Sequence, residues 1–454
     1  MRRLPRPYLH RRPPEVAETT TVAAVLERRA HADYRGAREE ALRALAQLDA
    51  DPAAGAADRF ELLIELGRLH QELGDLDEAV SVLTRAASSA DADALRSRAL
   101  ARLASVYANQ ARYDEAESAA EAALALTEEQ SLEAADALIE LAGAQFVRSA
   151  YDPAQENVLR ALPWAEDASP GLERDRVRAG ARATLGNLHR ARGRYREAES
   201  LFRENIALAE DAFGPSSVET ANALNDLGIL FKYAGRFDEA EPLYRRALDI
   251  NVKAVGEVNY NAASIYHNLG GLEHARGNYE QAEPYARRSA EIRRQALGPD
   301  HPVTAADEAA LASILYALGK DEEAEELLRQ AISTYEQAYG GEHYELAVHL
   351  NNLAAILQRR EADEDAERLY RRALAMKEKL IGADNPVLAN TLNNLAVICR
   401  RHGRLEEAER LYERALRLLE AGVEPGHPTL VTTRRNYATL VRARDREAER
   451  SSRS

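Results

Sequence analysis

Histidine recurs in this chain at a spacing that raises the question of metal binding. His301, His343 and His427 occupy one register of a 42-residue period. Ligands of one zinc ion each lie about 2 Å from it, whereas equivalent positions on neighbouring packed helices are about 8–10 Å apart. The other places in this register hold residue types that cap helix N-termini: Ser217, Asn259 and Asn385. The register therefore predicts N-caps rather than a metal site.

The sequence offers no motif or residue that is typical of a catalytic site. Cys399 is the only cysteine, and it lies in the segment VICRR, at a helix position where a packing residue is expected. No segment matches GxxxxGK[ST], HExxH or a Gly-rich loop after a strand. Acidic pairs such as Glu322-Glu323 begin exposed helices, where they complement the helix dipole. We predict that the protein is not an enzyme and that it binds no metal or cofactor.

The composition and charge limit the classes of partner that the protein is expected to bind. The formal net charge is −15, whereas a protein that binds nucleic acid or an anionic membrane needs a basic face. No apolar run approaches the length of about 18–20 residues that spans a membrane. The N-terminal segment MRRLPRPYLHRRPPE is charged and lacks the apolar stretch of a secretory signal. A single cysteine suits a reducing compartment, so we predict a cytoplasmic protein.

A repeated unit organises the rest of the chain. Leu227 recurs as Leu269, Leu311, Leu353 and Leu395, which are evenly spaced by the same 42-residue period. A fixed period over several copies is typical of stacked repeats. The equivalent leucines upstream are spaced less evenly, at intervals of 37, 38 and 44: Leu66, Leu103, Leu141 and Leu185.

Each repeat reads as a helix, a short turn and a second helix that carries a small alanine. The second helices begin near the motifs GDLDEA, ARYDEA, AYDPA, GRYREA, GRFDEA, GNYEQA, GKDEEA, EADEDA and GRLEEA, after a first one marked by Tyr34 and Ala37. Glycine ends most of the first helices, where a residue with positive φ is usual. Glu361 replaces that glycine, so we expect its turn to close differently.

These patterns divide the chain into four parts. Residues 1–16, rich in arginine and proline, are predicted to form a disordered basic arm. Residues 17–168 form irregular repeats, and residues 169–445 form the regular 42-residue array with a C-terminal capping helix from His427 to about Arg442. Residues 446–454 form a polar tail. The join near Pro163–Gly171 is compatible with a hinge or with a kink in a continuous superhelix.

The repeat resembles the tetratricopeptide repeat family. Leu227-Gly228, Gly235-x-Phe237, Ala240 and Tyr244 match its helix-turn-helix consensus. The usual repeat of this family is shorter, at about 34 residues. The long form, with LNNLA at Leu350–Ala354 and Leu392–Ala396, is similar to kinesin light chains. The resemblance implies an all-α solenoid, a right-handed superhelix of about ten repeats and a capping helix. It also implies a concave groove, lined by the first helix of each repeat, that binds proteins or peptides. Members of the family rarely catalyse reactions.

In related repeats, asparagines near the key leucine hold the backbone of an extended peptide. An amide side chain offers both a donor and an acceptor to a peptide unit. This role carries over to the matching positions only: Asn225, Asn268, Asn351, Asn352, Asn393, Asn394 and Asn436. The alternative is that these asparagines bond neighbouring helices and set the packing of the repeats. Four neutral hydrogen bonds contribute roughly 2–6 kcal/mol, which is less than the roughly 8 kcal/mol of micromolar affinity, so other anchors are required.

Basic and aromatic residues supply candidate anchors near the end of each first helix. They are Lys232, His274, Tyr316, Arg359 and Arg400. Such a lining favours an acidic segment or a C-terminal carboxylate as the guest.

Two functions fit this architecture. The protein is a scaffold or adaptor that recruits a partner through the second-half groove, or it is a signalling regulator whose superhelix changes shape when a peptide or protein binds. Uniform packing across residues 163–171 favours the scaffold, and a pronounced break there favours the regulator.

Overall fold

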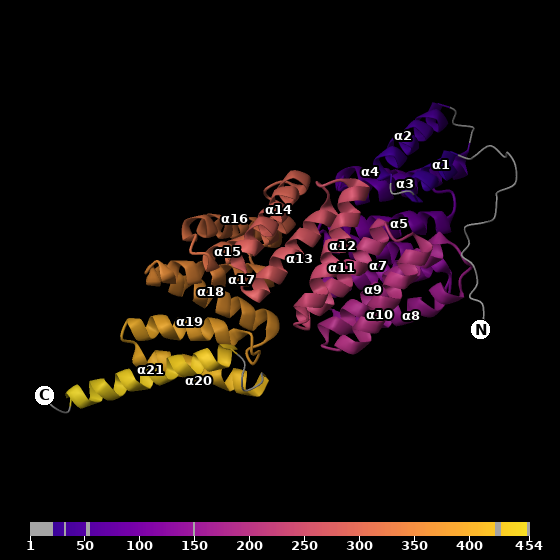
Figure 1. Ribbon diagram of the computed structural model, residues 1–454. Coiled ribbons are helices and arrows are strands. Elements are labelled where there is room, and N and C mark those ends of the chain that lie inside the picture. The colour runs from indigo at the N-terminus through magenta and orange to yellow at the C-terminus, as the bar shows by residue number, and fades with distance from the viewer. Residues whose placement is uncertain (1–20, 31–32, 51–54, 149, 423–427, 452–454) are drawn as a thin grey trace, which may run out of the picture. The chain divides into compact units, whose positions relative to one another are not determined.

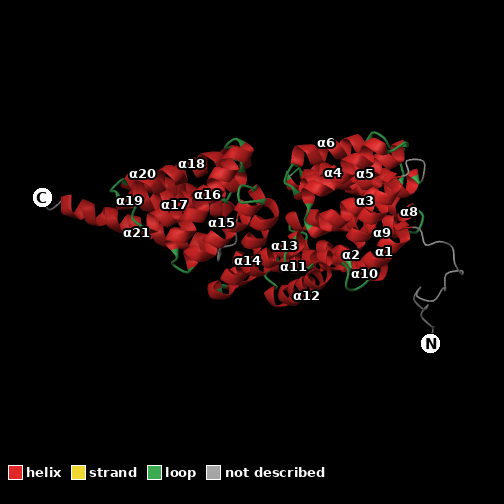
Figure 2. Ribbon diagram, turned by 90° about the horizontal axis from the view of Figure 1, so that it is seen from above, coloured by secondary structure: helices red, strands yellow, loops and turns green. Residues whose placement is uncertain are grey.

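The computed structural model describes residues 21–30, 33–50, 55–148, 150–422 and 428–451. These residues fold into 21 helices joined by turns, with no strand among them (Figures 1 and 2). The predicted basic arm of residues 1–16 lies outside the described residues.

The helices follow one another in this order: α1 (Thr21–Ala30), α2 (Tyr34–Ala50), α3 (Ala56–Leu73), α4 (Leu76–Ser89), α5 (Asp93–Asn109), α6 (Tyr113–Leu124), α7 (Leu132–Val147), α8 (Tyr151–Asp167), α9 (Leu172–Ala191), α10 (Tyr195–Ala212), α11 (Val218–Tyr233), α12 (Phe237–Val255), α13 (Tyr260–Arg276), α14 (Tyr279–Leu297), α15 (Pro302–Ala317), α16 (Asp321–Tyr339), α17 (Tyr344–Arg359), α18 (Asp363–Ile381), α19 (Leu388–Arg401), α20 (Leu405–Gly422) and α21 (Pro428–Ser451).

The fold is an all-α solenoid of ten hairpins closed by a final single helix, as the repeats predict. Each even-numbered helix begins where its sequence motif places it, from Tyr34 in α2 to Leu405 in α20. The capping helix α21 runs to Ser451, well beyond its predicted end at Arg442, so most of the predicted polar tail is helical.

A glycine and an aromatic ring set the closeness of the two helices in the fifth and sixth hairpins. A Cβ atom added to Gly228 would lie 2.6 Å from the Tyr244 ring, and one added to Gly186 would lie 2.6 Å from the Phe202 ring. Real Cβ atoms essentially never show such contacts, so an alanine at either position would force the ring or the helices to shift. Both rings are fully buried, as their spacing after the small alanine predicts.

Helices α15 and α17 are capped by residues in the histidine register, whereas the predicted N-cap Asn385 lies two residues before Val387, the N-cap of α19, which makes no side-chain cap. His301 Nδ1 accepts a hydrogen bond from the Val303 backbone N–H at 3.1 Å, and His343 Nδ1 accepts one from Glu345 N–H at 3.1 Å. An N-cap acceptor of this kind satisfies one of the free amide groups of the first turn. His427 lies outside the described residues.

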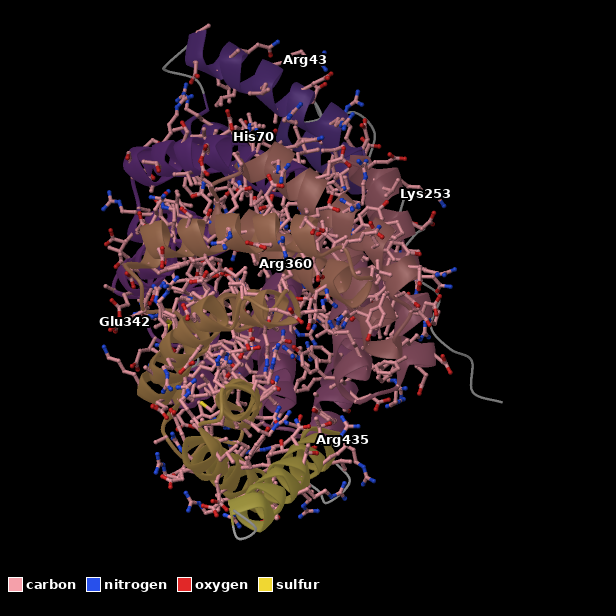
Figure 3. All side chains as sticks on the ribbon, turned by 90° about the vertical axis from the view of Figure 1, so that its left-hand side faces the viewer. Arg43, His70, Lys253, Glu342, Arg360 and Arg435 are labelled. Carbon is pink, nitrogen blue, oxygen red and sulfur yellow. The ribbon has the colours of Figure 1, made fainter. Side chains whose placement is uncertain are left out.

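Charged side chains are spread over the surface of the molecule (Figure 3), and those of the even-numbered helix α18 form ion pairs with its neighbours. Arg371 and Arg372 are exposed and pair with Glu407 and Glu336 on neighbouring even-numbered helices, each at 2.6 Å. This arginine doublet therefore lies on a solvated face.

The chain divides into two compact units, residues 1–262 and 263–454, and the division falls inside α13. The predicted domain boundary at residues 168 and 169 lies between α8 and α9, inside the first unit. Pro163 lies within α8 without ending it. One apolar core contains Leu138 of α7, Val158 of α8 and Leu185 of α9. One continuous apolar core therefore spans residues 163–171.

The turn at Glu361 closes in the same way as its glycine equivalents, so the expectation of a different turn was wrong. Glu361 adopts a left-handed conformation with φ 65°, and Gly403 adopts φ 72° at the same place one repeat later. This conformation costs a residue with a side chain about 1–2 kcal/mol. Packing of the adjoining hairpin therefore overrides the local preference of the backbone.

We predict that Glu361→Gly stabilises the protein. Relief of the left-handed strain, less the extra chain entropy of glycine, leaves a net gain of roughly 0.5–1 kcal/mol. The midpoint of urea unfolding measures it. Gly403→Ala, which introduces the same strain, is expected to lower that midpoint. Equal midpoints for wild type and Glu361→Gly would contradict the strain.

Candidate functional site

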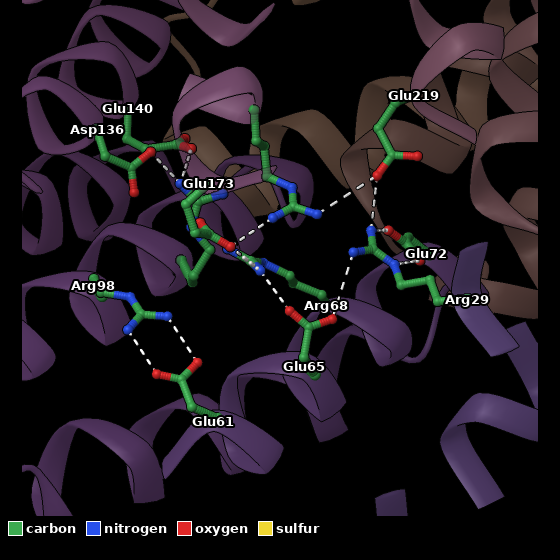
Figure 4. Close-up of polar contacts among 12 residues, drawn as sticks. Arg29, Glu61, Glu65, Arg68, Glu72, Arg98, Asp136, Glu140, Glu173 and Glu219 are labelled. Atoms are coloured by element: carbon green, nitrogen blue, oxygen red, sulfur yellow. Dashed lines mark hydrogen bonds and ion pairs between the residues drawn. The ribbon is translucent and has the colours of Figure 1, made fainter. Parts of the chain in front are cut away.

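We call the surface formed by the odd-numbered helices of each unit its inner face. In the first unit this face carries a closed circuit of alternating charges, which we call the ion ring (Figure 4). Its members come from α1, α3, α9 and α11: Arg29, Glu65, Arg68, Glu173, Arg176 and Glu219.

Most links in the ion ring are short. Arg68 binds Glu173 through two hydrogen bonds of 2.6 and 2.7 Å, and it binds Glu65 at 2.6 Å. Glu173 also accepts a bond from Arg176 at 2.7 Å, and Arg29 donates to Glu219 at 2.9 Å. Bidentate arginine–carboxylate pairs of this kind are among the strongest hydrogen bonds in proteins.

Further charged pairs extend the ion ring along the same face. Arg29 also pairs with Glu72, and Arg102 of α5 pairs with Asp136 and Glu140 of α7. Burial by itself raises the pKa of Glu173, but Arg68 and Arg176 hold it well below its usual range. Burial and the neighbouring arginines lower the pKa of Arg176 to about 10.

The ion ring closes the first unit upon itself. Arg29 of the first hairpin reaches Glu219 of the sixth, 190 residues later. Beside this contact, the Tyr34 hydroxyl oxygen accepts a hydrogen bond from the Val218 backbone N–H at 3.1 Å, at the start of α11. The first hairpin therefore contacts the sixth, and the inner face between them is occupied by the chain's own side chains. Glu65, Arg102 and Glu140, which directly precede key leucines, are the sequence signal of this network.

In the second unit the inner face is lined by asparagines in two rows that differ in burial. Asn351 and Asn393, which we call the bridging row, are 8% and 6% exposed. The Asn351 oxygen accepts a hydrogen bond from the Thr391 hydroxyl at 2.8 Å, and the Asn393 oxygen accepts one from the Asn436 amide at 3.0 Å. Each bond joins one inner helix to the next. For Asn351 and Asn393 the structure thus supplies the helix-bonding contacts of the alternative interpretation.

The second row, which we call the facing row, comprises Asn352, Asn394 and Asn436 and is only half-buried. Asn352 donates to the Ser313 hydroxyl at 3.4 Å. Asn394 accepts from Asn393 at 3.2 Å and also contacts the Tyr370 hydroxyl. Because an amide offers two donor hydrogens and an acceptor oxygen with two lone pairs, these contacts leave capacity for a ligand.

The remaining predicted residues are spread over both units. Asn268 is buried on α13, and His274 is exposed near the end of the same helix. Arg400 is half-buried on α19. Asn225 and Lys232 lie on α11, in the first unit, so the structure does not group them with the others.

Acidic residues neutralise part of the basic lining that the sequence predicts. Arg359 lies over the Tyr316 ring, 3.7 Å from its centroid, and pairs with Asp321. Arg401 pairs with Asp363 at 3.1 Å. The two aspartates begin α16 and α18, the helices that directly precede those of Arg359 and Arg401. From the sequence, acidic residues at such positions were expected only as partners of the helix dipole.

Comparison with known proteins places this repeat in a family. The tetratricopeptide repeat family matches residues 178–251, 261–337, 306–379, 345–421 and 387–450, and a second description of the same repeat matches residues 62–96 and 99–134. The chain belongs to the tetratricopeptide repeat family. Such repeats generally mediate protein–protein interaction and are typically non-catalytic. Among curated proteins, no relative matches the chain.

Solved structures with tetratricopeptide-like repeats resemble parts of the chain. One is BtubC (BKLC) from P. vanneervenii, 20% identical with a TM-score of 0.40, covering 52% of this chain and 92% of its own. Two others are a putative kinesin light chain with nearly identical repeats from Podosopora anserina and a point variant of the same protein. Each is 22% identical over 45% of this chain and 95% of its own, with TM-scores of 0.38 and 0.39.

Three observations concern metal ions, membranes and the single cysteine of this tetratricopeptide repeat array. The described residues contain no group of three or more His, Cys, Asp or Glu side chains arranged to hold a metal ion. No described helix is long and apolar enough to cross a membrane. Cys399 is fully buried in an apolar cluster, and burial raises the pKa of its thiol to about 11, so the reactive thiolate is disfavoured.

We predict that Arg29→Met destabilises the first unit by about 3–5 kcal/mol, because it leaves several buried carboxylates without their cation. Hydrogen exchange at the start of α11 and the midpoint of urea unfolding measure this loss. The adjacent Arg28→Met is the matched control: Arg28 is exposed and makes one surface pair, with Asp33, so its loss is expected to cost no more than about 1 kcal/mol. Equal effects of the two variants would show that the ion ring does not hold the unit closed.

We also predict an acid-sensitive site on α17. His349 is 3% exposed and packs edge-on against Tyr335, 4.9 Å between ring centroids. Burial, with help from His343, lowers its pKa to about 4. Between about pH 6.5 and 4 the unfolded chain binds this proton and the folded chain does not, so stability falls as the pH falls, by about 3 kcal/mol in total.

Urea unfolding measured from pH 7 to 4 tests this expectation. His349→Phe keeps the aromatic contact and is expected to flatten the pH dependence in that range. His402→Phe, at an exposed position, is not expected to flatten it. A pH dependence that is unchanged in His349→Phe would exclude His349 as its source.

Proposed function

We propose that the protein is a non-catalytic scaffold that binds an extended segment of a partner protein across the inner face of its second unit. The observation that carries this proposal is the facing row: Asn352 and Asn394 stand at the same register of α17 and α19 and are only half-buried. Amides that repeat in step with the helices are suited to the repeated amides of a peptide backbone.

The contrast with the first unit supports this choice of surface. The inner face of the first unit is occupied by the ion ring, whose charges satisfy one another. A neutral peptide there would compete with charge-assisted hydrogen bonds, which are about twice as strong as neutral ones. On the second unit's inner face a peptide meets neutral amides instead.

The backbone contacts require an additional anchor, and we propose that a carboxylate of the partner supplies it. Arg359 and Arg401 are already paired with aspartates, whereas Arg400 forms no ion pair with any described residue. Arg400 stands near the C-terminal end of α19, beyond Asn394 on the same helix. A charge-assisted bond there is worth about 1.5–3 kcal/mol, which brings the sum with the backbone contacts close to micromolar affinity.

The uniform core across α7, α8 and α9 supports the scaffold over the regulator that changes shape. We place the scaffold in the cytoplasm, because its single cysteine suits a reducing compartment.

Asn352→Ala combined with Asn394→Ala tests the proposal. Affinity capture of partners followed by mass spectrometry is expected to recover a partner with wild type, and the double variant is expected to bind it at least about fivefold more weakly. Its melting temperature is expected to stay close to that of wild type, because the facing row is half-buried.

Two control variants separate binding from folding. Asn222→Ala, an exposed asparagine on α11 of the first unit, is expected to leave binding and stability unchanged. Asn351→Ala with Asn393→Ala removes the bridging row and is expected to lower the melting temperature. A facing-row variant that melts early and still binds would show that the facing row is structural.

A further inference from the structure

A group of cationic side chains lies in the first unit, away from the ion ring. Arg190 and Lys232 stand one residue before the ends of the neighbouring inner helices α9 and α11, and Tyr233 is the last residue of α11. The Tyr233 ring centroid lies 4.9 Å from the Arg190 guanidinium carbon and 5.6 Å from Lys232 Nζ. Tyr233 is 59% exposed, the highest value among the exposed large apolar and aromatic side chains of the described residues.

These two cations have no carboxylate partner. Among the described residues, neither Arg190 nor Lys232 lies within 4.0 Å of a carboxylate oxygen, and Arg190 donates only to the Asn187 side chain, at 3.2 and 3.3 Å. Arg359 and Arg401, one residue further along their own inner helices, are each paired with an aspartate. Arg190 and Lys232 therefore differ from Arg359 and Arg401 in lacking a counter-charge, as Arg400 does at the equivalent place on α19.

The nearest acidic group does not remove this imbalance. Asp226 precedes Lys232 on α11, and burial raises its pKa to about 7 although Arg190 acts in the opposite direction. At neutral pH its carboxylate is thus only partly charged. Burial and the charge of Arg190 both lower the pKa of Lys232.

The ion ring is too distant to neutralise these cations. Glu219 lies in the first turn of α11, whereas Lys232 lies in the last turn of the same helix. At about 1.5 Å of rise per residue their backbones are about 20 Å apart, beyond the screening length of about 8 Å at physiological salt.

We propose that Arg190, Lys232 and Tyr233 form a binding site for an acidic segment of a partner protein. A carboxylate placed between the two cations accepts charge-assisted hydrogen bonds from both. The exposed face of the Tyr233 ring offers apolar surface to the side chain beside that carboxylate. The chain's net charge of −15 repels a long polyanion such as nucleic acid, whereas a short acidic segment feels mainly the local cations.

The competing explanation is that both cations only complement the C-terminal dipoles of α9 and α11. In that case each cation stabilises its own helix and no ligand is involved. The site does not depend on the proposed function of the second unit, so the two proposals fail separately.

Fluorescence anisotropy of the full chain with labelled hexaglutamate, at an ionic strength of about 0.15 M, tests the site. Wild type is expected to bind hexaglutamate and not hexaglutamine. Lys232→Gln and Arg190→Gln are each expected to weaken binding about tenfold or more, as the loss of a charge-assisted bond requires. Asp226→Asn is expected to strengthen binding roughly two- to fivefold, because it removes the nearby negative charge.

Lys253→Gln is the matched control. It makes the same chemical change in the same unit, but Lys253 is 74% exposed, points away from the chain (Figure 3) and pairs with Asp249. We expect it to change the affinity by less than about twofold. The facing-row variant Asn352→Ala with Asn394→Ala is expected to bind hexaglutamate as wild type does.

Three results would overturn the proposal. The first is no binding of hexaglutamate by wild type. The second is equal weakening by Lys253→Gln and Lys232→Gln, which would indicate a response to net charge alone. The third is tighter binding of a hexathymidylate than of hexaglutamate, which would assign the site to phosphate-bearing polymers.

A loss of thermal stability in Lys232→Gln without a loss of affinity would favour the dipole explanation.

Discussion

The close approach of the two helices within a hairpin is the constraint on which the fold depends. Gly228 and Tyr244 touch so closely that one added carbon atom would collide with the ring. This contact sets the spacing of the two helices, and the spacing sets how the next hairpin packs. Because glycine or alanine holds the position of Gly228 throughout the 42-residue array, small geometric requirements at one position propagate through the stack.

The two inner faces use their polar side chains differently. In the first unit, arginines and glutamates bond to one another and form a structural core of charges. Breaking such a network is costly, because each partner removed leaves a buried charge. In the second unit the bridging row joins successive helices with neutral amides, and the facing row remains half-buried. The facing row keeps hydrogen-bonding capacity for another molecule, whereas the charges of the ion ring satisfy one another.

Local patterns in the sequence predicted the hairpins well. They did not predict the contacts between residues that are far apart in the sequence. Tyr34 and Leu405 mark the starts of α2 and α20, because small and aromatic residues at helical spacing belong to a single helix face. The prediction that the turn at Glu361 closes differently was wrong, because packing imposed a left-handed conformation on a residue that disfavours it. Arg29 and Glu219 meet across 190 residues, and that meeting depends on the pitch of the whole unit, which no local pattern encodes. The separation of the asparagines into two rows likewise depends on the rotation between neighbouring helices.

Closure of the first unit limits how its length can change. Adding or removing one hairpin would carry Arg29 and Tyr34 away from Glu219 and Val218, so the first unit accommodates variation only inside its repeats. Its uneven leucine intervals of 37, 38 and 44 are variation of that kind. The bridging bonds of the second unit join only adjacent helices, so whole repeats can be inserted or lost there while each bond finds an equivalent partner. The even 42-residue period starts inside the first unit, at Leu185 and Leu227, and continues through the whole of the second unit, where the bonds between repeats permit such growth.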